Sequence, residues 1–98
     1  MKRRLKLNDM KNIKNIEKIV AETTTEYGDL MGVEMKVWNE KRIYFSRPDA
    51  PNAYKNVGYV DIATKAIFPQ NTPKSAFKVR TERDKSYINF LQRVADEI

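Results

Sequence analysis

The segment MGVEMKVWNEKRIYFS, residues 31–46, decides the fold of this chain. Apolar and polar side chains alternate along residues 31–38 and again along residues 42–46, which is the period of a β-strand. Residues 39–41, Asn-Glu-Lys, separate the two runs and have the composition of a turn. The segment therefore predicts an antiparallel hairpin with a three-residue loop.

The length of that loop sets which side chains share a face of the hairpin. A three-residue loop puts the aromatic and charged members on one face and the aliphatic members, with Phe45, on the other. A two-residue loop would shift the register by one position and mix the two faces, which a sheet with one buried face does not tolerate. The predicted pairs are Trp38 with Arg42, Val37 with Ile43, Lys36 with Tyr44, Met35 with Phe45, and Glu34 with Ser46.

An amphipathic helix is predicted on each side of the strands along the sequence. The first helix begins at Asn8 or Asp9, either of which can cap it, and ends at Gly28. The second helix begins at Thr81, which forms a capping box with Asp84. The apolar stripes are Met10, Ile13, Ile16, Ile19, Val20 and Tyr27 in the first helix, and Tyr87, Ile88, Leu91, Val94, Ala95 and Ile98, flanked by Phe90, in the second.

Shorter elements are expected between the hairpin and the second helix. Residues 57–62 predict a third strand and residues 66–68 a short fourth strand. Residues 47–56 and 69–75 are rich in turn formers and predict loops, and residues 76–80 predict a brief strand or extended segment.

These elements predict an α+β domain of order α-β-β-β(-β)-α. Each helix has one apolar face and so does the antiparallel sheet, so both helices are expected on the same sheet face in a two-layer fold. The opposite sheet face is then open. The domain is expected to span residues 8–98, with residues 1–7 as a basic N-terminal arm.

The composition argues against several kinds of chemistry. The 98 residues include no cysteine and no histidine, which removes disulfides, thiolate nucleophiles and the usual acid–base residue near neutral pH. The three glycines are far apart, and no acidic cluster has calcium-loop spacing. We therefore expect no catalytic residue, no metal site and no small-molecule cofactor. Short apolar runs, and no apolar stretch of signal-peptide length after the basic start, lead us to expect no membrane association and a cytoplasmic location.

The open sheet face is the main candidate site. The predicted register places Trp38, Tyr44 and Tyr59 on it, with Lys36 and Arg42 between them. Aromatic rings interleaved with cations can stack unpaired bases and contact phosphates, and the net charge of +6 favours polyanionic partners. The same rings would also suit a protein interface or a homodimer.

Further basic residues are candidates for contacts with nucleic acid or with another partner. Arg3 and Arg4 belong to the N-terminal arm, and Arg47 opens the loop 47–56. Lys78, Arg80 and Arg83 crowd the approach to the second helix, where loops and helix starts bind phosphates.

The sequence thus predicts a non-catalytic, basic binding module, with nucleic acid as one ligand. The alternative is a small inhibitor or adaptor of the phage or mobile-element type, which binds a protein partner such as a nucleic-acid-handling complex, or a homodimerising module.

Overall fold

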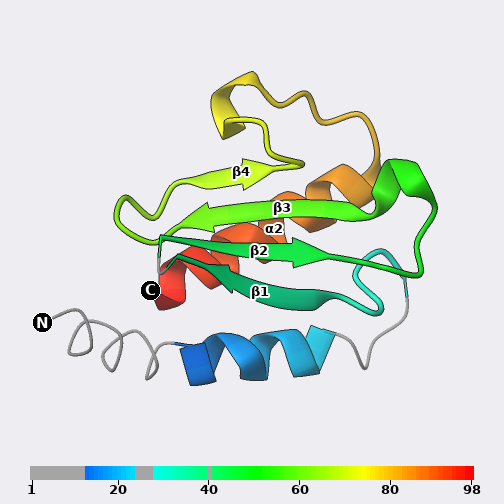
Figure 1. Ribbon diagram of the computed structural model, residues 1–98. Helices are drawn as coiled ribbons and strands as arrows, with labels where there is room; N and C mark the ends of the chain where they lie inside the picture. The colour runs from blue at the N-terminus through cyan, green and yellow to red at the C-terminus, as the bar shows by residue number, and fades with distance from the viewer. Residues whose placement is uncertain (1–12, 24–27, 40) are drawn as a thin grey trace, which may run out of the picture.

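The computed structural model describes residues 13–23, 28–39 and 41–98. It contains a four-stranded antiparallel sheet with helices on one face (Figure 1). The predicted α+β class and element order are confirmed. The strands lie in the order β1-β2-β3-β4. The elements are α1, whose described part is residues 13–23, β1 Glu34–Trp38, β2 Arg42–Ser46, η1 Asn52–Tyr54, β3 Asn56–Asp61, β4 Ile67–Pro69, η2 Lys74–Ala76 and α2 Glu82–Glu97.

The β1–β2 hairpin has the predicted register at all of its pairs, from Trp38 opposite Arg42 to Glu34 opposite Ser46. The N–H of Lys41 donates to the carbonyl of Trp38 at 3.0 Å and closes the loop. Strand β1 begins later than predicted, because residues 28–32 form a turn in which Gly32 has a φ of 79°. A strand cannot continue through that left-handed conformation.

Strand β3 lies between β2 and β4 and carries an irregularity. Its pairing with β2 passes from Phe45–Gly58 to Ser46–Asn56, which leaves Val57 as the extra residue of a bulge. Strand β4 begins one residue later than predicted, and Gly58 faces its backbone. Gly58 has a φ of 133°, and a Cβ there would lie 2.4 Å from the carbonyl oxygen of Phe68. Only glycine permits this close approach of the two strands.

Both helices cover the same face of the sheet, as predicted, and α2 runs behind the strands in Figure 1. Arg93 of α2 donates to Glu22 of α1 at 2.6 Å, so the two helices lie side by side. Phe90 was expected beside the α2 stripe but belongs to it, since it is buried edge-on against Phe45 with ring centroids 4.8 Å apart. The core consists of Ile16, Ile19, Val33, Ile43, Phe45, Val57, Val60, Ile67, Tyr87, Phe90, Leu91, Val94 and Ala95.

The capping box at the start of α2 is confirmed. The hydroxyl of Thr81 accepts from the N–H of Asp84 at 3.2 Å, and the carboxylate of Asp84 accepts from the N–H of Thr81 at 3.3 Å. The segment before it, residues 77–80, begins with an extended Phe77 and pairs with no strand among the described residues. The predicted loop 69–75 contains the start of η2.

Several predictions fall outside the described residues, namely the arm 1–7, the helix start at Asn8 or Asp9, and the stripe residues Met10 and Tyr27. Within the described ranges, neither helix is long and apolar enough to cross a bilayer.

Replacing Gly58 by alanine is expected to destabilise the fold by about 4 kcal/mol, because the new Cβ adds left-handed backbone strain to a clash with β4. Equilibrium unfolding in urea measures this loss. Gly32→Ala is the matched control, since Gly32 also has a positive φ but has open space where its Cβ would lie, and about 1–2 kcal/mol is expected. Equal losses for the two variants would show that the contact with β4 is unimportant.

Candidate functional site

The face of the sheet opposite the helices gathers the aromatic and basic residues that the sequence predicted there. The register of β1, β2 and β3 aligns them in rows across the strands. We call the row of Lys36, Tyr44, Tyr59 and Phe68 the aromatic row, and the row of Trp38, Arg42 and Asp61 the tryptophan row.

The aromatic row is a continuous set of ring contacts. Tyr44 and Tyr59 lie with ring centroids 4.9 Å apart at an interplanar angle of 40°. Tyr59 and Phe68 stack at 4.4 Å and 10°. Phe68 is not among the residues that the sequence predicted for this face. Pairing Val60 with Ile67 across the turn after β3 would have placed it beside Tyr59.

Arg42 joins the two rows. Its Cζ lies 5.9 Å from the ring centroid of Trp38 and 4.6 Å from that of Tyr59, both within the range of cation–π attraction. Its Nη1 donates to the hydroxyl of Tyr44 at 3.0 Å. This hydrogen bond raises the pKa of Arg42 above its usual value. Three side chains therefore hold one cation in place on the open face.

The rings differ in how much surface they offer to a ligand. Tyr59 is only 8% exposed, because Arg42, Tyr44 and Phe68 pack around its ring. It lies on the predicted face, but it supports its neighbours and presents little surface to a base. Trp38 is 47% exposed at the end of β1, and Lys36 on the same strand is exposed as well. The accessible part of the face is therefore its Trp38 end.

Two carboxylates share the open face with these cations. Asp61 accepts a hydrogen bond from the N–H of Thr64 at 3.0 Å, so it also stabilises the turn between β3 and β4. Glu34 lies at the opposite end of β1 from Trp38, about 13 Å away along the strand. Within the aromatic and tryptophan rows, the Trp38 end therefore carries two cations, Lys36 and Arg42, and one acid, Asp61.

Arg47, which the sequence grouped with the binding residues, has internal partners. Its Nε donates to the carbonyl of Met31 at 3.0 Å and its Nη1 to the hydroxyl of Tyr87 at 3.1 Å. Tyr87 is fully buried, and its own hydroxyl donates to the carbonyl of Tyr54 at 2.7 Å. Arg47 thus connects the turn before β1 to α2, and the structure gives it a stabilising role.

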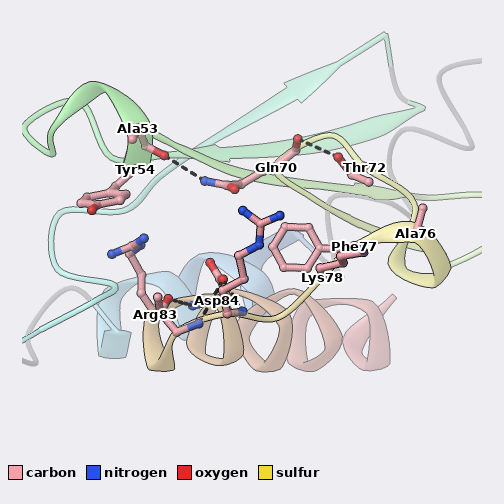
Figure 2. Close-up of a pocket in the computed structure, with 11 residues that line it drawn as sticks. Ala53, Tyr54, Gln70, Thr72, Ala76, Phe77, Lys78, Arg83 and Asp84 are labelled. Atoms are coloured by element: carbon pink, nitrogen blue, oxygen red, sulfur yellow. Dashed lines mark hydrogen bonds between the residues drawn. The ribbon is translucent and has the colours of Figure 1, made fainter.

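Lys78, Arg80 and Arg83 come together elsewhere, around a hollow at the start of α2 (Figure 2). Arg83 lies against the ring of Tyr54, with its Cζ 3.3 Å from the ring centroid. Apart from Arg47, the described basic candidates therefore divide into two groups, one on the open face and one beside α2. Arg3 and Arg4 lie outside the described residues.

No three histidine, cysteine or acidic side chains gather to form a possible metal site within residues 13–23, 28–39 and 41–98. Comparison with protein-family models, with curated proteins and with solved structures finds no match.

Replacing Arg47 by methionine is expected to lower the free energy of unfolding by about 2 kcal/mol, because the side chain's bonds to Tyr87 and to two turn carbonyls are lost. Lys36→Met, which removes an exposed charge, is expected to change it by less than about 0.5 kcal/mol. Urea denaturation compares the two variants. If Arg47→Met lowers the free energy of unfolding as little as Lys36→Met does, Arg47 is again a candidate binding residue.

Proposed function

We propose that this protein binds single-stranded nucleic acid, without catalysis, through Trp38 and the basic side chains beside it. The observation that carries the proposal is an exposed indole next to a guanidinium that Tyr44 and Tyr59 hold in place. A ligand that suits this pair has a flat ring to stack and a negative charge to neutralise. A nucleotide with an unpaired base has both.

Stacking on Trp38 supplies the base contact. An aromatic side chain contributes about 1–3 kcal/mol for each base stacked on it, whatever the base. Because Arg42 contacts both Trp38 and Tyr59, the indole is supported from the sheet before a ligand arrives. Such preorganisation lowers the entropy that binding loses.

Lys36 and Arg42 supply the phosphate contacts. Arg42 lies opposite Trp38 on β2, and Lys36 lies two residues before Trp38 on the same face of β1. Lys41 in the hairpin loop adds an exposed cation nearby. The net charge of +6 adds a long-range attraction for a polyanion. These contacts do not depend on base identity, so we expect weak sequence preference.

The shape of the face favours a single strand. Four strands about 4.8 Å apart span about 14 Å from β1 to β4, and four-stranded sheets of RNA-binding modules stack two or three unpaired bases. Bases in a duplex are paired and stacked already, so they cannot reach Trp38.

The carboxylates of the open face support a role without catalysis. Hydrolysis by a pair of carboxylates needs them close together, about 3 Å apart in aspartic proteases and about 5–9.5 Å apart in glycosidases. Glu34 and Asp61 lie in different rows, with β2 between their strands, and are separated by about 13 Å or more.

A protein partner or a second copy of the chain is the other candidate, and edge strand β1 favours it. Val37 and Trp38 are consecutive residues of that strand, and they are 36% and 47% exposed. Met31, in the turn before β1, is 53% exposed. Exposed apolar side chains along a sheet edge are typical of protein contacts.

Trp38 is the only tryptophan, so its fluorescence reports binding at the proposed site. Titration with a short single-stranded oligonucleotide is expected to quench it, with an affinity that falls roughly tenfold between 50 and 200 mM salt. Arg42→Met should weaken binding about tenfold, because it removes both a phosphate contact and the support of the indole. Lys14→Met, an equal charge change on α1, should leave the affinity within about twofold.

Unfolding curves of both variants serve as the stability control. Absence of quenching at low salt, together with self-association in sedimentation experiments, would contradict nucleic-acid binding and support the β1 interface.

A further inference from the structure

A hollow with a volume of about 480 Å³ opens between η1, the turn after β4 and the start of α2. Figure 2 shows Tyr54 and Arg83 on one side of it, Gln70 above and Phe77 on the other side. It lies beside α2, on the helix side of the molecule, and none of its lining residues belongs to the aromatic or tryptophan row. It is therefore a second location, separate from the Trp38 end of the sheet.

The lining of the hollow has an excess of two positive charges. Its charged lining residues are three cations, Lys78, Arg80 and Arg83, and one acid, Asp84. The carboxylate of Asp84 is buried and accepts from the backbone N–H groups of Arg80 at 2.9 Å and of Thr81 at 3.3 Å. None of the three cations forms an ion pair with another described residue. Asp84 therefore bonds the backbone at the helix start and forms no ion pair with the three cations.

Arg83 carries a polar atom that no described protein group satisfies. Its guanidinium lies against Tyr54, which fixes its plane, with Cζ 3.3 Å from the ring centroid. Its Nε is buried and has no hydrogen-bond partner among the described residues. A buried donor without an acceptor is unfavourable, and most such groups in folded proteins are paired. Arg83 also lines the hollow, so a ligand oxygen there could accept from the outer N–H groups of this guanidinium.

We infer that this hollow binds a phosphate-class oxyanion. A phosphate monoester carries a charge of roughly −1.5 to −2 near neutral pH, which matches the excess of two positive charges. Its several oxygens suit the planar forks of two arginines together with a lysine. A monocarboxylate would leave one charge unbalanced. The inference does not depend on the proposed function of the open face.

The test is a titration of the ¹⁵N-labelled full chain with inorganic phosphate at constant ionic strength, followed by amide chemical shifts. Saturable shifts are expected for residues 53–54 and 78–84, and acetate should bind at least fivefold more weakly. Arg83→Gln and Arg80→Gln should each weaken phosphate binding at least fivefold. Lys14→Gln, an equal charge change on α1, should leave it unchanged.

Linear, unsaturated shifts with phosphate would overturn the inference, as would equal affinities for phosphate and acetate. Arg80 is the decisive position, because its side chain is exposed and Arg80→Gln should keep the fold even if Arg83→Gln disturbs the contact with Tyr54. If Arg80→Gln behaves like Lys14→Gln, the site is refuted.

Two further ligands identify the source of the phosphate if the site is real. An oligonucleotide with a 5′-phosphate that binds more tightly than its 5′-hydroxyl form, with the difference lost in Arg80→Gln, would identify a strand end. Equal binding of the two oligonucleotides, with saturable inorganic phosphate, would identify a small free phosphate compound. Trp38 quenching reports the open face separately, so failure of one site leaves the other testable.

Discussion

The loop that joins β1 to β2 is the constraint on which the rest of the structure depends. Because Trp38 pairs with Arg42, the following pairs place Ile43 and Phe45 against the helices and Tyr44 on the open side. A slip of one residue would bury a guanidinium and a phenol in the core and expose the apolar face, which the free energy of burial forbids. The hydrophobic core and the candidate site are therefore two consequences of one register.

On the open face, packing has divided the aromatic residues into two roles. Tyr59 is surrounded by Arg42, Tyr44 and Phe68 and supports them by packing. Trp38 stays exposed, and Arg42 of this group lies within cation–π range of its ring. The cation thus links a buried part of the face to the surface that a ligand can reach.

The start of α2 shows how a small domain uses buried polar groups. Thr81 and Asp84 satisfy the first backbone donors of the helix, and Tyr87, one turn later, connects it to Tyr54 and Arg47. These bonds fix η1 and the turn before β1 relative to the helix. The same arrangement places Arg83 against Tyr54 and leaves Lys78, Arg80 and Arg83 without an ion pair among the described residues, which is the basis of the anion site proposed here.

Local order in the sequence determined the elements and the contents of each sheet face. Alternation along 31–38 and 42–46 predicted the hairpin and its register, and Thr81 with Asp84 predicted the start of α2. The hairpin register and the start of α2 depend on residues close together in the chain, so the spacing of those residues predicts them. Only the tertiary structure decided the internal role of Arg47, whose partner Tyr87 is 40 positions away, the contact of Arg83 with Tyr54, and the stack of Phe68 on Tyr59. The burial of Phe90 against Phe45 belongs with them. Such contacts depend on how separate elements pack, and no local period in the sequence encodes that packing.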